Sequence, residues 1–571
     1  MLQTGARVIV EGLEREGVKF VFGIPGIGTL ELFDAFRESK IKSVLVTHEQ
    51  SASFMADAYS RITGEVGVCC SIGGPGILNM FTGLAEAYLD SSAVVALVSS
   101  TSNDTNKSFH LHQINQIQAI RPIVKDVFSV EKNDDLLDII SQAFDLAKSG
   151  EPGPVIVGIP LNILQEASIF TQHYERKTQE DSNEAKIKEI ADLLVNSKSL
   201  CIYAGLGAFN ASSEINELAE KLSVPVATTV SARGVIPEDH PLAIGCGFGF
   251  GNYKLAFDIL KKSDTILAVG CKFSELSTGG WSLKIPENLI HIDRNKDVFN
   301  KNYPAKFTLV SDIKVALRKI LVVIKAVNSK KNPKLIKEIK ETKERYLRDI
   351  DRHRLKGSIS PQIFFYELRK LLDRDSILVT DCGNHQLYAI SNFPIFKERT
   401  FISPIDFQAM GFGIPAAIAA KIACPEKKVA CVCGDGGFLM TGFELLTAVR
   451  EKLDLAVIIF NDSALGLIKG LQKAIYGRTS SVDFINPNYK LLADSFGAKY
   501  IEINDGQQVG NGLKSALLEN GVVIVDCKIN YKGLPSYIKN ILWESFKDFS
   551  LKEKLLLVSR IIYQHAIKKK L

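Results

Sequence analysis

The segment from Gly434 to Gly466 contains the residue types that hold a divalent cation against a phosphate. Gly434, Asp435 and Gly436 follow the apolar run KKVACVC, and Asn461 follows a second apolar run, LAVIIF. The two runs predict buried strands of a parallel sheet that end at the same edge. Glycines let backbone N–H groups approach a phosphate at a helix N-terminus, and Mg²⁺ takes oxygen ligands that it shares with phosphates. A lone Gly-Asp-Gly is often only a tight turn, but with Asn461 at this distance the pattern predicts a Mg²⁺-bridged diphosphate.

This pattern resembles the thiamine diphosphate (ThDP) signature of the pyruvate oxidase, 2-oxo acid decarboxylase and acetolactate synthase enzymes, and the resemblance covers residues 1 to about 530. It implies that the side chains of Asp435 and Asn461 and the backbone carbonyl of Ser463 bind Mg²⁺. It also implies that the same segment supplies the diphosphate contacts and the residues flanking the cofactor ring, which are Gly436, Gly437, Gly466, Leu467 and Ile468.

Glu49 stands where a strand expected over residues 43–47 gives way to a helix, in the sequence VLVTHEQSASFMADAYSRITG. By resemblance it is the family's activating glutamate, which bonds a ring nitrogen of the cofactor's pyrimidine. A carboxyl group in an apolar site can hold and pass a proton there, so that the cofactor's own amino group can deprotonate C2. The alternative is a carboxylate that stabilises the start of a helix.

Two further segments resemble parts of the same site. The loop at residues 381–386 resembles one that closes over the diphosphate, which implies contacts from Gly383, Asn384 and His385. A helix-capping Asp and Asn in a turn is the other interpretation, and the two could hold together. In DFQAMGFGIPAAIAA, Met410 matches the apolar residue that bends the cofactor, and the backbone of Gln408 and Met410 would bond the pyrimidine. By residue type alone, Met410 would be core filling.

Two glycine-rich loops near the N-terminus are expected to reach the cofactor from the other side. They span residues 23–26, which include Pro25 and Gly26, and residues 73–76. A glycine-rich loop is weak evidence by itself, so this expectation depends on the neighbouring motifs.

Acetolactate synthases carry the most similar set of motifs, but the substrate side of this chain departs from theirs. Their Phe-Gln-Glu segment falls here on Leu111, His112 and Gln113. We expect the imidazole of His112 and the amide of Gln113 to bond a substrate oxygen or to relay a proton; an exposed loop histidine is the alternative. Leu471 stands where the biosynthetic enzymes carry a Trp that favours the larger second oxo acid, so both substrates remain open.

FAD is a second cofactor that the resemblance raises. Acetolactate synthases bind it in their central domain, and residues 228–229 and 270–273 fall near two of its contacts. However, Lys272 replaces an Arg whose planar fork an ammonium group does not reproduce, and GCGFGFGN replaces a His-containing loop. The sequence therefore leaves FAD binding open.

These residues need a scaffold of alternating strands and helices. Short apolar runs alternate with helical patterns in three parts of the chain, which predicts an α/β fold of three doubly wound parallel-sheet domains. We expect the domains at residues 1–172 (pyrimidine-binding), 185–328 (central) and 358–530 (diphosphate- and Mg²⁺-binding). The charged segment 329–357 predicts a solvated linking helix. In the basic tail, residues 531–571, Ser550 is expected to open an amphipathic helix whose apolar face is formed by Leu551, Leu555, Val558 and Ile562.

The composition indicates a globular protein. The 571 residues suggest three or four domains, and 46% hydrophobic and 23% charged residues are ordinary values. No apolar run is long enough to span a membrane, and the N-terminus does not read as a signal peptide. Ten cysteines without a CxxC pair predict reduced core residues of a cytoplasmic protein. The net charge of +5 comes from the tail, where nine Lys/Arg face three acidic residues, so the near-neutral body predicts no nucleic-acid binding.

Together these features predict an enzyme that decarboxylates pyruvate or a similar 2-oxo acid on ThDP-Mg²⁺ and transfers the resulting carbanion to a second carbonyl, as in acetolactate formation. A non-oxidative decarboxylase that releases an aldehyde is the alternative, and a catalytically silent protein is disfavoured because Glu49, Asp435 and Asn461 are all present. The resemblance implies a homodimer, or a dimer of dimers, in which Glu49 and the diphosphate site come from different subunits. The tail is expected to pack on the body or at a subunit interface, with a weak contact to anionic lipid as the alternative.

Overall fold

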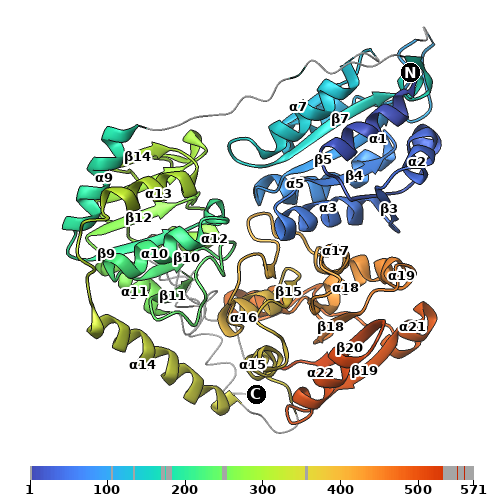
Figure 1. Cartoon of the computed structure of the whole chain (residues 1–571). Coiled ribbons are helices and arrows are strands. Elements are labelled where there is room, and N and C mark those ends of the chain that lie inside the picture. Colours follow the sequence, from blue (N-terminus) through green and yellow to red (C-terminus); the bar gives the residue numbers. More distant parts are fainter. Residues whose placement is uncertain are drawn as a thin grey trace.

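The computed structural model describes residues 3–104, 107–132, 135–168, 174, 183–246, 254–353, 358–531, 550 and 559. Within these ranges the chain forms three six-stranded sheets of parallel strands flanked by helices (Figure 1). A short antiparallel pair, β1 (Gln3–Thr4) with β8 (Ala167–Ser168), brings the start of the chain against residues that follow the first sheet. The α/β class and the three parallel sheets predicted from the sequence are confirmed.

The first block comprises the elements from α1 to α8, and its sheet has the order β3-β2-β4-β5-β7-β6. Its strands are β2 (Phe20–Gly23), β3 (Lys42–Leu45), β4 (Gly67–Ser71), β5 (Val94–Ser100), β6 (Asp126–Ser129) and β7 (Pro154–Pro160). Its helices are α1 (Gly5–Arg15), α2 (Leu30–Arg37), α3 (Glu49–Thr63), α4 (Pro75–Asn79), α5 (Phe81–Leu89), α6 (Gln116–Ile120), α7 (Leu136–Lys148) and α8 (Leu161–Gln165). Strands β4 and β7 are buried along their whole length, which explains why they read as continuous apolar runs.

The central block has the sheet order β11-β10-β9-β12-β13-β14. Its strands are β9 (Leu200–Ala204), β10 (Val226–Thr228), β11 (Ala243–Cys246), β12 (Thr265–Val269), β13 (Asn288–Asp293) and β14 (Phe307–Val310). Its helices are α9 (Glu184–Asn196), α10 (Ser212–Leu222), α11 (Lys254–Lys262), α12 (Glu275–Thr278) and α13 (Ile313–Val323). The predicted linking helix follows as α14 (Pro333–Asp349), whose side chains are mostly exposed.

The third block has the sheet order β16-β15-β17-β18-β20-β19. Its strands are β15 (Ile377–Thr380), β16 (Phe401–Ile402), β17 (Val429–Gly434), β18 (Leu455–Asn461), β19 (Lys499–Ile503) and β20 (Val522–Lys528). Its helices are α15 (Pro361–Leu371), α16 (Asn384–Asn392), α17 (Gly413–Ala423), α18 (Asp435–Thr441), α19 (Leu445–Arg450), α20 (Gly466–Tyr476), α21 (Tyr489–Phe496) and α22 (Val509–Leu518), with the 3₁₀ turn η8 (Gly442–Glu444) between α18 and α19.

Helices α3 and α17 join the first and third blocks into one hydrophobic core. Both helices are buried almost all round, so each has apolar surface beyond what its own sheet covers. Phe54 of α3 and Phe412, just before α17, pack edge to face with their ring centroids 5.5 Å apart. Residues of both blocks therefore belong to the same buried cluster, although the two helices lie far apart in the sequence.

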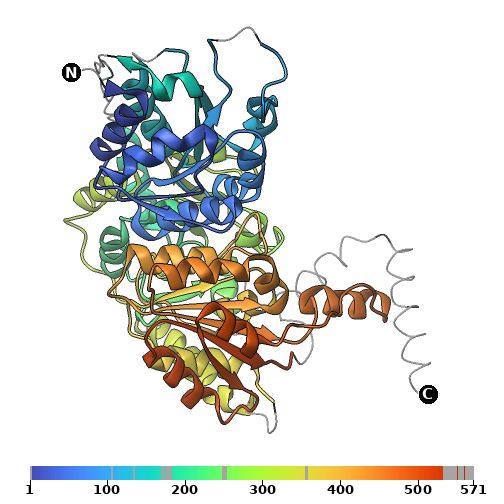
Figure 2. The same ribbon diagram turned by 90° about the vertical axis from the view of Figure 1, so that its right-hand side faces the viewer.

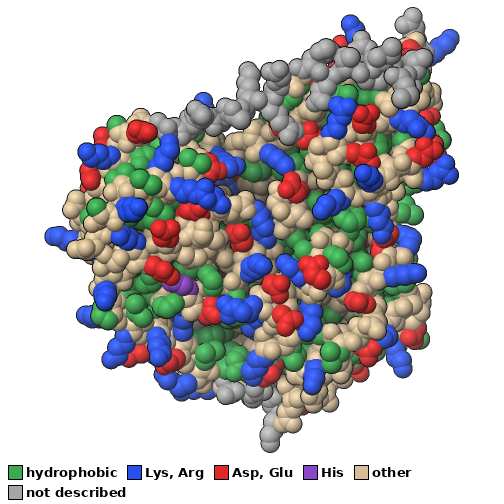
Figure 3. Space-filling model, viewed as in Figure 1, with side chains coloured by type: hydrophobic (Ala, Val, Ile, Leu, Met, Phe, Trp, Pro, Cys, Tyr) green, Lys and Arg blue, Asp and Glu red, His purple; other side chains and the backbone are tan. Residues whose placement is uncertain are grey.

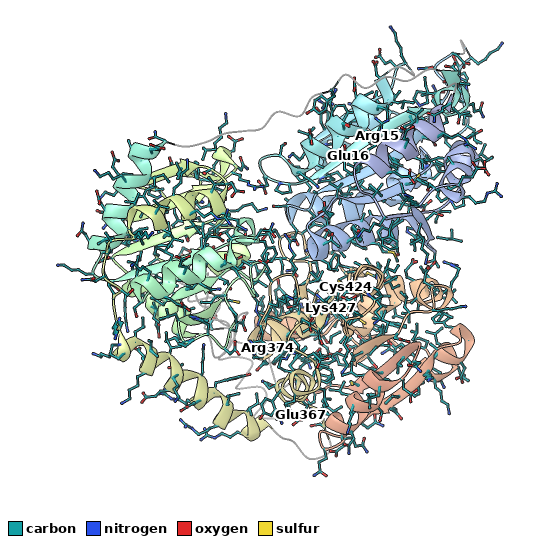
Figure 4. The ribbon with its side chains drawn as sticks, in the orientation of Figure 1. Arg15, Glu16, Glu367, Arg374, Cys424 and Lys427 are labelled. Carbon is teal, nitrogen blue, oxygen red and sulfur yellow. The ribbon has the colours of Figure 1, made fainter. Side chains whose placement is uncertain are left out.

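Polar contacts attach the central block to the third. The buried Arg233 donates to Glu238 and to the backbone carbonyl of Phe393, and Arg374 pairs with Asp239 at 2.6 Å. Figure 4 labels Arg374 where the third block faces the central one. Apolar contacts join these two blocks as well, since Val230 and Cys246 of the central block belong to a buried cluster of third-block side chains.

Other sequence expectations concern the surface and the tail. All ten cysteines lie in the described ranges and all are free thiols, eight of them buried. On the face shown in Figure 3, cationic and anionic side chains are interspersed rather than gathered into one basic area. No helix in the described part of the chain is long and apolar enough to cross a membrane. The predicted helix of the basic tail falls outside the described residues, apart from Ser550 and Ser559.

Candidate active site

The predicted ligands of the cation lie at one edge of the third sheet. Strands β17 and β18 are neighbours, with Gly434 opposite Phe460 in the register, so Asp435, just after β17, and Asn461, the last residue of β18, lie at adjacent strand ends. As predicted, the Gly-Asp-Gly turn begins a helix, α18, with Gly434 as its N-cap. The carboxylate of Asp435 is thus placed at a helix N-terminus, where the backbone dipoles favour negative charge.

Asp435 is buried and held by backbone donors. Its Oδ1 accepts the N–H of Gly436 at 2.9 Å, and its Oδ2 accepts the N–H of Ser463 at 2.7 Å. Burial raises the pKa of this carboxyl, while hydrogen bonds from Asn486 and Ser463 oppose the rise. A cation beside Asp435 would compensate the desolvated charge, which is the behaviour expected of a metal ligand.

Asn461 is oriented by Asp526, which sequence reasoning missed. Its Nδ2 donates to Asp526 Oδ1 at 2.8 Å, and a carboxylate can only accept, so Asn461 must direct its carbonyl oxygen away from Asp526. Lys528 in turn pairs with Asp526 at 3.1 Å. The only local signal was an acidic residue inside the apolar strand sequence VVIVDCK.

Asn486 is a second residue that sequence reasoning missed. Its Nδ2 lies 2.9 Å from Asp435 Oδ2 and 3.0 Å from Asn461 Oδ1. The third predicted ligand, the Ser463 carbonyl, accepts the N–H of Phe484 at 3.1 Å. The segment FINPNY reads as a turn and contains no signal of a metal site.

The glycines of the predicted diphosphate site are close to other site residues. A Cβ on Gly437 would lie 2.5 Å from Asp381 Oδ2, and one on Gly466 would lie 2.5 Å from Asp462 Oδ2 and 3.2 Å from Asn384 Nδ2. A Cβ on Gly436 would lie 3.3 Å from Met410 Cε. The four predicted segments around residues 384, 410, 436 and 466 therefore meet.

The loop at residues 383–385 leads into α16. Its N-cap is Gly383, at φ 143°, and no side chain caps the helix, so the helix-cap interpretation of Asn384 is wrong. Among the described residues, Asn384 Oδ1 and His385 Nε2 are buried polar atoms without a partner. Burial lowers the pKa of His385 to about 3, against a hydrogen bond with the Asp381 backbone, so the ring is neutral. Such unsatisfied atoms fit a site completed by a polar ligand.

The segment from Ser403 to Met410 is held by the first block. Glu86 accepts the N–H of Ala409 at 3.0 Å, and Asp90 accepts those of Ile405 at 2.8 Å and Asp406 at 2.7 Å. Arg61, which pairs with Asp57 and Asp90, donates to the Ser403 carbonyl at 2.8 Å. Gln408 has a left-handed backbone (φ 62°), and these four contacts hold the chain on both sides of it.

Glu49 begins α3, with His48 as the N-cap, in agreement with the predicted strand-to-helix junction. Strand β3 ends at Leu45, two residues before the predicted end, because the N–H of Thr47 bonds Glu444 instead of continuing the sheet. In the described chain the carboxylate of Glu49 bonds only Asn79, at 3.0 Å, and no hydrogen bond or ion pair joins it to Asp435, Asn461 or Met410. Within the described part of one chain, the structure thus shows no hydrogen bond or ion pair between Glu49 and the predicted metal ligands.

The first-block loops lie near one another. Pro25 is exposed, and a Cβ on Gly26 would lie 2.6 Å from Ile72 Cγ2, just before the second loop. A Cβ on Gly74 would lie 2.7 Å from the His112 carbonyl oxygen. The side chains of His112 and Gln113 are both exposed, and Gln113 accepts the N–H of His110 at 2.9 Å.

The residues that follow Gly466 form α20, which stands out from the third block on the right of Figure 2. No residue of this helix is buried. Ile468 is 45% exposed, and Leu467 and Leu471 are half-buried. In a single chain, the apolar side chains of helix α20 therefore remain partly exposed to solvent.

A cavity of about 310 Å³ lies where the three blocks meet. Gly205 and Gly270 line it at the ends of β9 and β12, where the strand order of the central sheet reverses, which is the usual position of a nucleotide site in such sheets. Thr229 Oγ1, a buried hydroxyl without a partner among the described residues, also lies on the cavity wall. Lys272 pairs with Glu151 at 2.9 Å and donates to Ser91, and although burial opposes it, Glu151 raises the pKa of Lys272.

Comparison with known protein families finds the same three parts. Residues 3–119 match the N-terminal TPP binding domain of the thiamine pyrophosphate enzymes, residues 187–320 match their central domain, and residues 381–527 match their C-terminal TPP binding domain. Thiamine pyrophosphate is another name for ThDP.

Relatives match along nearly their whole length. A probable acetolactate synthase large subunit of Methanocaldococcus jannaschii is 34% identical over 546 residues, 92% of each chain. The acetolactate synthase isozyme 3 large subunit of Escherichia coli is 32% identical over 549 residues, 92% of this chain and 95% of the relative. The acetolactate synthase large subunit of Buchnera aphidicola subsp. Schlechtendalia chinensis is 34% identical with the same coverage. The chain therefore belongs to the thiamine pyrophosphate enzyme family, in the group of the acetolactate synthase large subunits.

Proposed function

We propose that this chain catalyses the ThDP- and Mg²⁺-dependent decarboxylation of pyruvate or a related 2-oxo acid, and the joining of the remaining fragment to a second carbonyl compound. The names of the relatives support the overall reaction. The observation that carries the proposal is that Asp435 and Asn461 accept hydrogen bonds from one amide group, that of Asn486. In the same block, Asn384 and His385 have buried polar atoms without a partner among the described residues.

The protein's part in this reaction follows from its residues. When bound, ThDP supplies the carbon centre at which a 2-oxo acid loses CO₂. Asp435, Asn461 and the Ser463 carbonyl would hold Mg²⁺ on the diphosphate, and the loop at residues 383–385 would face the phosphate oxygens. Met410 would wedge the cofactor into its bent shape, which explains why the segment before it is fixed by Glu86 and Asp90.

Glu49 would hold a proton at the pyrimidine ring. Since its carboxylate does not bond the predicted metal ligands of its own chain, we propose a homodimer or dimer of dimers in which Glu49 faces the partner's diphosphate site. Exposed apolar side chains follow the Gly-Asp-Gly motif, with Met440 59% and Phe443 65% exposed, and Ile27 of the first block is 66% exposed. Such side chains are typical of surfaces that another subunit covers.

Product analysis tests the reaction. Purified protein is incubated with ThDP, Mg²⁺ and a panel of 2-oxo acids, and the products are identified by mass. A hydroxy-oxo acid with the carbons of both reactants supports the carboligase, whereas an aldehyde alone supports the alternative, a non-oxidative decarboxylase. If none of the 2-oxo acids in the panel is consumed, the proposal is contradicted.

We further propose that the cavity between the blocks is the place where FAD would bind. Two observations support a nucleotide here: the cavity lies where the strand order reverses, and the buried Thr229 hydroxyl has no partner among the described residues. One observation differs from the family pattern, because Lys272 pairs with Glu151 of the first block and stands in place of the expected arginine. The visible spectrum of the purified protein decides this: flavin absorption supports the assignment, and a colourless protein that takes up no added FAD contradicts it.

Four further proposals concern the domain bounds, the localisation, nucleic acid and the substrate contacts. The domains span residues 1–172, 185–328 and 358–530, the chain is cytoplasmic, as its ten free thiols suggest, and it binds no nucleic acid. His112 and Gln113 contact the substrate from an exposed loop.

A further inference from the structure

The segment at residues 482–486 lies over the predicted metal ligands. Asn486 Nδ2 bonds Asp435 and Asn461, and the Phe484 N–H bonds the Ser463 carbonyl. The Val482 carbonyl accepts the N–H of Leu465 at 2.8 Å. One short segment thus contacts all three groups assigned to Mg²⁺, and it lies 16 to 20 residues beyond Gly466, where the segment that identified them ends.

The orientation of the Asn486 amide follows from a chain of donors and acceptors. Asp526 can only accept, so Asn461 must donate to it with Nδ2 and present Oδ1 on its other side. Asp435 also presents an oxygen. The group that faces both oxygens must therefore be the NH₂ of Asn486, since a flipped amide would place oxygen against oxygen.

We propose that Asn486 is a positioning residue of the magnesium site, which holds the ligand oxygens of Asp435 and Asn461 at a fixed separation; this inference rests on the proposed function. Each oxygen has two lone pairs, and Asp435 Oδ2 uses both, for Asn486 Nδ2 and the Ser463 N–H. Asp435 would therefore face the cation with Oδ1, which accepts the Gly436 N–H. Asn461 Oδ1 has one short bond, from Asn486, and can also face the cation. Asn486 Oδ1 is buried without a partner in the described chain, and it is available to accept a hydrogen bond from a water that Mg²⁺ retains.

Two substitutions test the role. Partners that orient metal ligands typically contribute about 10- to 100-fold in metal affinity. Asn486→Ala should weaken the binding of Mn²⁺, measured by electron paramagnetic resonance with saturating ThDP, by about tenfold. Asn486→Leu should weaken it by about 100-fold, because leucine also excludes a water that could replace the amide.

A neighbouring asparagine provides the matched control. Asn488 caps α21 by accepting the N–H of Leu491 and does not contact the ligands, so Asn488→Ala should lower the thermal stability but leave the Mn²⁺ affinity unchanged. Circular dichroism without Mn²⁺ shows whether each variant is folded, and if Asn486→Leu is not, Asn486→Ala decides alone.

The outcomes separate this inference from the proposed function. If the wild-type protein binds no Mn²⁺ with ThDP, the proposed function fails and this inference with it. If the wild-type protein binds Mn²⁺ and the folded Asn486 variants bind it equally well, only the positioning role is overturned. Because the readout is metal binding, it does not depend on the identity of the substrate.

Discussion

At the scale of single residues, the role proposed for Glu49 is one that its local geometry does not reveal. The carboxylate bonds Asn79 and begins a helix, which a structural glutamate could also do. Its proposed task, holding a proton at the cofactor ring, can be separated from binding by an isosteric change.

Glu49→Gln should retain ThDP affinity, because the amide keeps the size and a hydrogen bond, but it cannot hold the same proton. Decarboxylation should fall by about 100- to 10,000-fold, the usual contribution of a positioned acid or base. Calorimetric titration with ThDP and the rate of CO₂ release give the two quantities. Turnover close to that of the wild type would refute the role of Glu49.

Asp381 should make the stability of the chain depend on pH. Burial raises its pKa to about 7, although backbone N–H groups of Cys382 and Gly411 oppose the rise. Above about pH 4 the unfolded chain has lost this proton, while the folded chain keeps it up to about pH 7. The folded state binds more protons in this window, so its free energy of unfolding falls as the pH rises from 4 to 7.

The variant Asp381→Asn removes the titration. Its melting temperature should fall less than that of the wild type between pH 5 and pH 7, while at pH 5 the two proteins should be similar, because Asn resembles the protonated acid. Scanning calorimetry at pH 5, 6, 7 and 8 measures both slopes. Equal slopes would show that Asp381 is already ionised throughout this range.

At the scale of elements, helix α5 fixes the segment that would shape the cofactor. Glu86 Oε2 accepts the Ala409 N–H, next to Met410. Burial raises the pKa of Glu86 well above its ordinary value, even though Arg61 opposes the rise. A protonated Glu86 could still accept this bond, and so could a glutamine.

We therefore expect Glu86→Ala to lower ThDP affinity by about tenfold, the equivalent of one lost hydrogen bond, and Glu86→Gln to restore most of it. Calorimetric titration of both variants against the wild type checks this. If the glutamine variant loses as much ThDP affinity as the alanine variant, the hydrogen bond from the Ala409 N–H to residue 86 does not support ThDP binding.

The sequence could predict those parts of the site that lie at or near the end of a strand. Asp435, Asn461 and Glu49 lie at junctions whose strand and helix patterns are local, and the three sheets follow from the same patterns. Asn486 and Asp526 could not be found this way, because they are 25 and 65 residues from Asn461 and reach it only through the fold. The strand orders and the contact of Glu86 with Ala409, 323 residues away, are likewise long-range properties.

At the scale of the whole molecule, the proposed dimer predicts that two inactive variants can restore each other. In a hybrid of Glu49→Gln with Asp435→Ala, one site contains both defects and the other contains neither. Random co-assembly makes half of the dimers hybrids, so co-expression should give about a quarter of wild-type activity.

Each variant alone, and the double variant Glu49→Gln/Asp435→Ala co-expressed with itself, should stay inactive. Asp435→Ala should also fail to retain ThDP when Mg²⁺ is present. Absence of any activity in verified hybrids would mean that Glu49 and Asp435 serve the same site from one chain.

The shared core of α3 and α17 affects how the chain is made. Residues 49–63 leave the ribosome long before residues 413–423, and until then one side of α3 has no apolar partner. The first block therefore completes its folding only when most of the chain has been synthesised, although its own sheet can form earlier. During this interval the surface around Phe54 is exposed to other nascent chains, so we expect the yield of folded protein to depend on chaperones that bind apolar surfaces during translation.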